Sequence, residues 1–180
     1  AGERFQTKSD SEMVLHLYPK LGLEDMLPHL RGEFAFGLFD KQHDRLILVR
    51  DRFGVKPLYW TECNGQIVFG SELKVLFAHP DVPRRFNAKG VFHQLMQTIV
   101  PGSTAFAGVH QVKPGHMLTI RRRDGRLHIE ESCYWDMPFP EEDARGEPAN
   151  ESEYIDGVRE HLIEAVQLRL EADVPVGCYL

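Results

Sequence analysis

The chain has 180 residues, of which 42% are hydrophobic, 27% charged and 10% aromatic, a composition typical of a folded protein rather than a disordered one. Its formal net charge of -6 argues against a dedicated nucleic-acid-binding protein. No apolar run approaches the roughly 20 residues that span a bilayer. Three cysteines without a C-x-x-C pair favour a reducing compartment. We therefore expect a cytoplasmic protein with no nucleic-acid or membrane partner.

The chain begins with a helical pattern. Ser9 or Asp10 can cap a helix whose apolar residues recur at helical spacing as far as Leu21. Gly22 breaks this pattern, and a second short helix is expected over residues 23–30.

Strand patterns dominate the next hundred residues. Apolar alternation or continuous apolar runs predict strands over 34–39, 46–49, 58–60, 67–69, 117–120 and 127–131. The continuous run 46–49 predicts a buried strand, covered on both faces. Asn64-Gly65 and Asp124-Gly125 separate two pairs of these strands, and both dipeptides are strong hairpin signals. Ser71 and Asn87 are expected to cap short helices between the strands.

The composition changes after residue 135. Residues 136–148 are acidic and rich in proline, as in a linker. Asn150 and Glu153 resemble a capping box before an amphipathic helix that ends near residue 171. The apolar run 174–180 then predicts a buried strand. Because the chemistry of α/β folds usually follows such a strand, we expect this to be an interior segment of a longer chain.

The residues alone support little chemistry. The sequence contains no H-E-x-x-H, P-loop, G-x-S-x-G or G-x-G-x-x-G motif. Arg121-Arg-Arg123 reads as a solvated hairpin tip, with a phosphate or nucleic-acid patch as the alternative. Cys178 reads as a small core residue, because nothing near it in sequence would lower the pKa of its thiol. Composition and spacing thus predict only an α/β segment.

Six stretches taken together are more specific. They are, in chain order, Thr7-Lys-Ser-Asp-Ser-Glu12, Arg31-Gly-Glu-Phe-Ala-Phe36, Arg50-Asp-Arg-Phe-Gly-Val-Lys-Pro-Leu-Tyr59, Ser71-Glu-Leu-Lys74, Lys113-Pro-Gly-His116 and Tyr134-Trp-Asp136. In this order and with these gaps, the sequence resembles the glutamine-hydrolysing asparagine synthetase family over essentially all of its length. Residues 173–180 resemble the strand that leads into the family's Ser-Gly-Gly-x-Asp-Ser pyrophosphate loop, which would begin at the next residue.

The resemblance implies a fold in two parts. Residues 1–135 would be the latter half of an α+β glutaminase, an αββα sandwich of the N-terminal-nucleophile type. Residues 136–149 would be a linker. Residues 150–180 would supply the first helix and strand of an α/β ATP-pyrophosphatase domain.

The resemblance also implies an activity. In the family, an N-terminal Cys hydrolyses glutamine to glutamate and ammonia, with its own α-amine as general base. The ammonia amidates an ATP-activated carboxylate, typically that of aspartate, with release of AMP and pyrophosphate, while Mg²⁺ neutralises phosphate charge. The implied partners are therefore glutamine, aspartate and ATP, and a homodimer is compatible with the family.

Few of the family's site residues fall within these 180 residues. The nucleophilic Cys and the Asn-Gly-Glu motif do not, so we assign no catalytic residue and no metal ligand. Asp10 matches the family aspartate that binds the α-amino group of glutamine. Tyr179 and Leu180 match positions that contact ATP, although Tyr179 stands where an aliphatic residue is common. The loop 50–57 could line the glutaminase pocket, form a domain interface or be a mere charge cluster on a turn.

Three other interpretations remain open. A sibling amidotransferase could use another acceptor, for example in exopolysaccharide or peptide-like product clusters. Amidotransferases that act on sugar phosphates share the glutaminase half, but the linker, helix and terminal strand disfavour them. A non-catalytic glutaminase-like module is the alternative outside the enzymes. In every case we expect the 180-residue segment by itself to be inactive.

Overall fold

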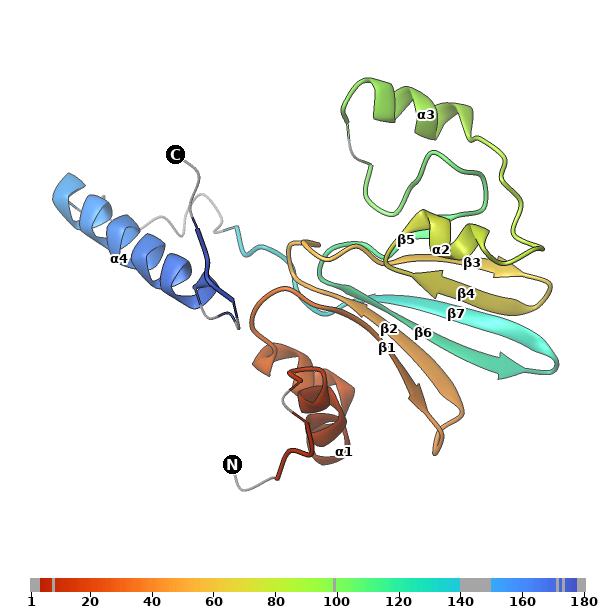
Figure 1. The fold of residues 1–180 in the computed structure, drawn as a ribbon, viewed down its shortest axis with the longest axis horizontal. Helices are drawn as coiled ribbons and strands as arrows, with labels where there is room; N and C mark the ends of the chain where they lie inside the picture. The colour runs from red at the N-terminus through yellow and green to blue at the C-terminus, as the bar shows by residue number, and fades with distance from the viewer. Residues whose placement is uncertain are drawn as a thin grey trace. The chain divides into compact units, whose positions relative to one another are not determined.

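The structure is a computed structural model that describes residues 4–7, 9–98, 100–139, 150–170, 172 and 174–177. The chain divides into two compact units, Ala1–Met137 and Pro138–Leu180. Figure 1 labels their helices and strands.

Strands of the first unit form two antiparallel sheets in the described residues. The first sheet has the order β1-β2-β6-β7, with β1 (Ala35–Asp40), β2 (Arg45–Arg50), β6 (His116–Arg123) and β7 (Arg126–Cys133). The second sheet has the order β4-β3-β5, with β3 (Tyr59–Cys63), β4 (Gln66–Gly70) and β5 (His110–Gln111). The expected strands are therefore confirmed, and β5 lies in a stretch with no clear strand pattern.

Helices accompany both sheets. They are α1 (Glu12–Met26), the 3₁₀ turn η1 (Leu27–His29), α2 (Leu73–Phe77) and α3 (Ala88–Leu95). Helix α1 is broken at Gly22, whose φ of 76° and ψ of 179° are not helical. This break separates the two expected helical segments, which follow one another within α1. Glycine adopts a positive φ without the steric cost that a Cβ would add.

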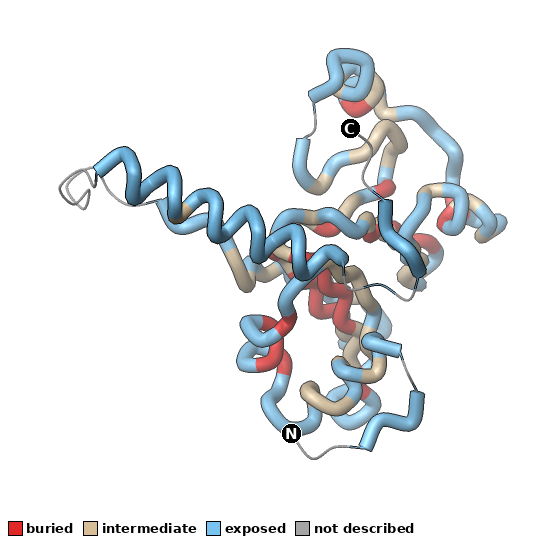
Figure 2. Tube along the Cα trace, turned by 60° about the vertical axis from the view of Figure 1, so that its left-hand side comes forward, coloured by how far each residue is buried: buried red, intermediate tan, exposed pale blue. Residues whose placement is uncertain are grey.

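Strand β2 lies at the centre of the core. Ile47 and Val49 pack with Leu23, Met26 and Leu27 of the helical layer. On the opposite face, Leu48 belongs to the cluster between the two sheets, with Leu58, Val112, Leu118 and Ile120. Because both faces are covered, the expectation of a strand buried on both sides is confirmed (Figure 2). With α2 against β3 and β4, the first unit is an α+β sandwich.

The turn residues determine the conformation of the two predicted hairpins, β3–β4 and β6–β7. Asn64 and Gly65 have φ values of 50° and 71°, and Asp124 and Gly125 have 50° and 75°. Two consecutive positive φ values give the turn whose twist matches that of the flanking strands. The predicted hairpins are confirmed.

The helix caps follow the sequence less closely. Asn87 caps α3 as expected, and its side chain accepts a hydrogen bond from the Lys89 amide. The expected caps of the first two helices are wrong. Ser11 is the N-cap of α1, Glu72 is that of α2, and neither makes a side-chain capping hydrogen bond.

The second unit contains α4 (Glu151–Arg169), which begins after Asn150. Asn150 caps this helix as the sequence predicts, but its side chain accepts a hydrogen bond from the Ser152 amide rather than from Glu153 of the expected capping box. No described residue of α4 is buried (Figure 2). Residues 174–177 are not in a strand, so the expected terminal strand is wrong over these positions. A strand needs a neighbour to pair its backbone groups, and none is present among the described residues of this unit.

In the described part of the chain, no helix is both long enough and apolar enough to cross a bilayer.

Candidate functional site

A cavity of about 540 Å³ lies beside the start of α1 and the edge strand β1. Its polar lining includes Asp10, Arg31, Glu33, Lys56 and Ser71. Its apolar lining includes Met13, Val14, Phe34 and Phe36. An apolar recess with a few polar groups is the usual form of a small-molecule site. Except for Met13 and Val14, these residues come from four of the six family-like stretches, and Asp10 and Ser71 are about 60 residues apart in the sequence.

Asp10 lies in the turn that precedes α1. Its backbone carbonyl accepts a hydrogen bond from the Met13 amide at 2.9 Å, which starts the helix. Its side chain is exposed, and within the described residues its carboxylate makes no hydrogen bond or ion pair. The carboxylate is therefore available to an incoming cation such as an ammonium group.

Glu12 holds the segment that carries Asp10. Its carboxylate accepts hydrogen bonds from the Gln6 amide at 2.7 Å, and from the Thr7 amide and hydroxyl at 2.8 and 2.7 Å. His16 Nε2 lies 3.1 Å from the same carboxylate. The Gln6 amide first, and then Thr7, lower the pKa of Glu12 from 4.5 to about 2. The sequence singles out Glu12 only as the last residue of the stretch 7–12, and its place at the start of α1 lets its side chain reach back to Gln6 and Thr7.

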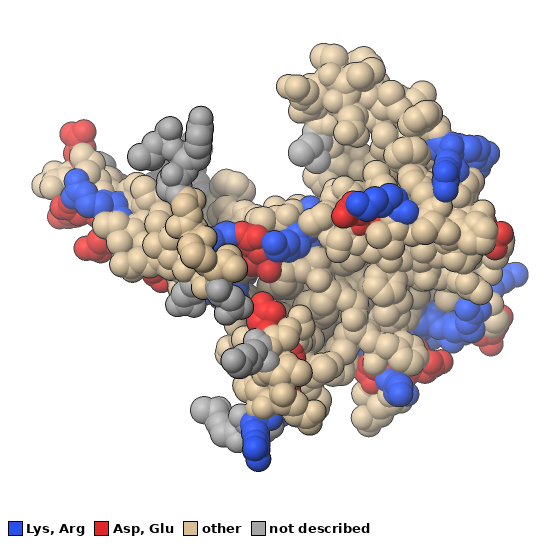
Figure 3. All heavy atoms as spheres, in the orientation of Figure 1, with Lys and Arg blue, Asp and Glu red and all other residues tan. Residues whose placement is uncertain are grey.

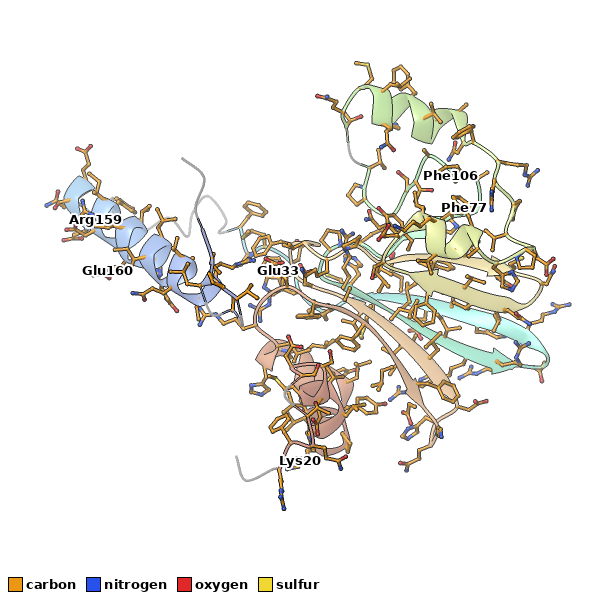
Figure 4. All side chains as sticks on the ribbon, in the orientation of Figure 1. Lys20, Glu33, Phe77, Phe106, Arg159 and Glu160 are labelled. Atoms are coloured by element: carbon orange, nitrogen blue, oxygen red, sulfur yellow. The ribbon has the colours of Figure 1, made fainter. Side chains whose placement is uncertain are left out.

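Both signs of charge line the cavity. Lys56 Nζ lies 3.3 Å from Glu33 Oε2, and Figure 4 shows Glu33 on the segment that joins the helical layer to β1. Arg31 on the same segment is exposed. Together with Asp10, these groups offer an anion for an ammonium and cations for a carboxylate. Such a lining suits a free amino acid, which carries both charges.

Arg50 fixes the loop that carries Lys56. Its Nε donates to the Lys56 carbonyl at 2.8 Å, and its Nη1 donates to the Val112 carbonyl at 2.8 Å. Its Nη2 donates to the Gly54 carbonyl. Burial lowers the pKa of Arg50, and the charge of Asp51 opposes this effect. The guanidinium thus satisfies two carbonyls of this loop and the Val112 carbonyl outside it.

Asp51 satisfies the donors of the same loop. Its carboxylate accepts hydrogen bonds from the amides of Phe53, Val55 and Lys56 at 3.2, 2.9 and 2.9 Å. Asp51 is only 1% exposed. Arg50 and Asp51 together therefore hold the loop 50–57 from inside, and Lys56 and Pro57 line the cavity. The interpretation of this loop as a mere charge cluster is wrong, whereas its role in a domain interface stays a prediction.

The two remaining family-like stretches, 113–116 and 134–136, are hydrogen-bonded to this loop. The Gly115 amide donates to the Asp51 carbonyl at 2.9 Å, and the Tyr134 hydroxyl donates to the Arg50 carbonyl at 2.7 Å. Burial is the main cause of the raised pKa of Tyr134. Gly115 has a φ of 65°, and a Cβ there would lie 2.2 Å from the Trp135 carbonyl oxygen. All six stretches thus either line the cavity or hold its lining.

Other expected features lie away from the cavity. Lys and Arg side chains gather near the β6–β7 hairpin (Figure 3), where Arg122 Nη2 donates to the Gly65 carbonyl at 2.6 Å. Arg122 therefore links two hairpin tips, in agreement with the hairpin-tip interpretation. Cys63 is buried and its thiol donates to the Asp81 carbonyl. No group of three or more potential metal ligands occurs in the described ranges.

Three predicted residues lie outside the described residues. They are Cys178, for which a core position was expected, and Tyr179 and Leu180, which were expected to contact ATP.

Comparison with known proteins gives one domain family. Residues 1–135 match the glutamine amidotransferase domain. "Amidase chry2" of Gibberella zeae is 40% identical over 177 residues, which are 98% of this chain and 25% of that protein. "Asparagine synthetase [glutamine-hydrolyzing] 3" of Bacillus subtilis is 35% identical over 181 residues, or 99% of this chain and 28% of that protein. The chain thus spans about a quarter of the length of these relatives.

Among solved structures, a glutamine phosphoribosylpyrophosphate amidotransferase from Bacillus subtilis matches 72% of this chain and 24% of its own. The TM-score is 0.45 and the sequence identity 23%.

Proposed function

The chain belongs to the glutamine amidotransferase domain family, and from that premise we propose that its cavity binds the glutamine whose side-chain amide the full-length protein hydrolyses. The observation that carries the proposal is the convergence of four family-like stretches on one cavity, with the Asp10 carboxylate at its rim. Hydrolysis of the amide gives glutamate and ammonia.

Asp10 has a defined role in this proposal. Its carboxylate pairs with the α-ammonium of glutamine, while Arg31 and Lys56 provide positive charge for the α-carboxylate. The apolar side chains of Phe34 and Phe36 exclude water from the methylene groups of the substrate. Since charge-assisted hydrogen bonds are stronger than neutral ones, the zwitterionic end of the substrate fixes its orientation.

The experiment compares two aspartates near the same helix. In the full-length protein, Asp10→Asn is expected to raise the glutamine KM about 10- to 100-fold, because a hydrogen bond to a charged group contributes about 1.5–3 kcal/mol. Synthesis from free ammonia should be unchanged. Asp25→Asn alters an exposed residue of α1 that does not line this cavity, and it should leave both reactions unchanged. An unaltered glutamine KM in Asp10→Asn would show that the assignment of Asp10 is wrong.

For the second half of the reaction, we propose ATP-dependent amidation of a carboxylic acid, with aspartate as the first candidate. Asparagine synthetases among the relatives support aspartate. The ATP and Mg²⁺ part rests on the sequence resemblance of residues 173–180, because the described residues hold no metal cluster.

A different acceptor is the second candidate, since two relatives at 40% identity carry the name amidase. The test supplies glutamine and ATP with aspartate or with other carboxylic acids. Asparagine formation coupled to AMP release supports the first candidate. AMP release that requires another acid supports the second. Absence of glutamate release under every condition would instead favour a non-catalytic module.

A further inference from the structure

Four polar side chains meet where α1 lies against the β1–β2 hairpin. The carboxylate of Asp40, at the end of β1, accepts a hydrogen bond from the Tyr18 hydroxyl. Arg45, its cross-strand neighbour in β2, donates from Nε to Asp40 at 3.1 Å and from Nη2 to the Tyr18 oxygen at 2.7 Å. His43 Nδ1 lies 2.7 Å from the same Asp40 oxygen. Tyr18 is therefore joined to both strands of the hairpin.

The other Asp40 oxygen is also engaged. It accepts hydrogen bonds from the Gln42 and His43 amides at 3.0 and 3.2 Å. The Tyr18 hydroxyl is the largest cause of the strongly lowered pKa of Asp40, with His43 and Arg45 acting in the same direction. Asp40 is 7% exposed, so the carboxylate has a fixed set of partners that hold it in one orientation.

The position of Tyr18 along α1 gives this contact its importance. The buried residues of the helix, Leu23 and Met26, follow the break at Gly22, and no residue of the segment 12–21 is buried. The segment 12–21 is thus connected to the anchored half of α1 through a non-helical residue. Its contacts with the sheet, those of Tyr18 included, must set its direction.

We propose that the Tyr18–Asp40–Arg45 cluster is a positioning device that orients the first half of α1 and so places Asp10 in the cavity. This inference rests on the proposed function of Asp10. Tyr18 lies six residues after Glu12, or about 9 Å along a helix. A tilt of the helical segment at Tyr18 therefore also moves its first turn. Glu12 lies in that turn, and Asp10 lies in the turn directly before it.

The test uses Tyr18→Phe in the full-length protein, which keeps the ring and removes the hydroxyl. The variant loses the hydrogen bond that Tyr18 donates to Asp40 and the one that it accepts from Arg45. The glutamine KM is expected to rise about fivefold, which corresponds to about 1 kcal/mol. The kcat with saturating glutamine and the rate with free ammonia should be unchanged, because Tyr18 does not touch the reacting atoms. A merely structural role would also lower the kcat and the rate with free ammonia.

His43→Ala provides the matched control. It removes a contact to the same carboxylate through a side chain that is 57% exposed, but it leaves the link to α1. The glutamine KM should not change. Asp40→Asn keeps an oxygen that can accept from Tyr18, and it should have a smaller effect than Tyr18→Phe.

Hydrogen exchange separates this inference from the proposed function. Tyr18→Phe should speed exchange of the amides of residues 13–18, 20 and 21 relative to those of 23–26, whatever the activity; Pro19 has no amide hydrogen. Unchanged exchange would overturn the positioning role. If Asp10→Asn raises the glutamine KM and Tyr18→Phe does not, the positioning role fails and the proposed function stands. If exchange speeds up but neither variant alters the KM, the glutamine site is wrong, and with it the placement of Asp10.

Discussion

On one side of the cavity, the loop 50–57 is held by two buried groups. Arg50 donates to the carbonyls of Gly54 and Lys56, and Asp51 accepts from three of the loop's amides. On the other side, the segment 6–12 is held largely by the carboxylate of Glu12. Buried hydrogen bonds are costly to break because the groups left behind lose water as well as a partner. The cavity therefore has one wall integral to the fold, whereas the other wall carries Asp10, the residue proposed to bind glutamine, on a segment with fewer buried contacts.

This difference has a functional consequence. Segments that adjust when a ligand binds belong to the less stable parts of a protein, since they must open without unfolding the rest. We therefore expect changes in the loop 50–57 to act mainly on stability. Changes in the segment 6–12 should act mainly on glutamine binding.

The largest expected effect is that of Asp51→Ala. The substitution leaves three loop amides without their acceptor and removes the negative charge beside buried Arg50. We expect a loss of about 3–5 kcal/mol in the free energy of unfolding of the full-length protein, measured by urea denaturation. Asp25→Ala, at an exposed position of α1, should change it by less than about 0.5 kcal/mol. A loss below about 1 kcal/mol in Asp51→Ala would contradict the description of this wall as integral to the fold.

A smaller effect is expected at Gly115, which joins the loop to the start of β6. Alanine here meets both an unfavourable φ of 65° and the Trp135 carbonyl oxygen, 2.2 Å from the new Cβ. Gly125 has a φ of 75° with open space around it. Gly125→Ala should thus cost about 1–2 kcal/mol for the backbone alone, and Gly115→Ala should cost about 1–3 kcal/mol more for overpacking. If Gly115→Ala and Gly125→Ala have equal free energies of unfolding, the contact of the new Cβ with Trp135 relaxes without cost.

The sequence was most informative where structure depends on neighbouring residues. Asn64-Gly65 and Asp124-Gly125 predicted two hairpins, because the turn conformation is a property of the dipeptide itself. The apolar run 46–49 predicted a strand buried on both faces. Asn87 was identified as a cap, whereas Ser71 was not one, because the chain enters α2 through extended Glu72. A cap depends on backbone direction as well as residue type.

Contacts between distant residues could not be predicted in this way. Arg50 donates to the Val112 carbonyl 62 residues later, and no periodicity indicates that pairing. Asp10 was named through the family resemblance, whereas its cavity partners Glu33 and Lys56 became visible only when the fold brought them together. The strand expected over 174–180 shows the same limit, since a strand is defined by a partner that its own residues do not specify.

The smallest effect is expected at Glu12. Its pKa is lowered from 4.5 to about 2 by the Gln6 amide and by Thr7, so the ionised carboxylate favours the folded segment. A lowered pKa means that this contribution is present above about pH 4.5 and is lost as the pH falls toward 2. NMR titration should give a Glu12 carboxyl midpoint near 2, with the Gln6 and Thr7 amide shifts following the same curve. A midpoint near 4.5 would show that these hydrogen bonds are not maintained in solution.

At neutral pH, Glu12→Gln tests how firmly the Glu12 carboxylate holds the segment 6–12, without lowering the pH. The amide keeps an oxygen acceptor but loses the charge, and charge-assisted hydrogen bonds are roughly twice as strong as neutral ones. The glutamine KM should therefore rise about two- to threefold in the full-length protein, well below the effect of Asp10→Asn, while urea denaturation stays close to that of the unaltered protein. Glu24→Gln, an exposed position on the same helix, should change neither. If Glu12→Gln instead lowers stability as much as Asp51→Ala does, the two walls of the cavity are held alike.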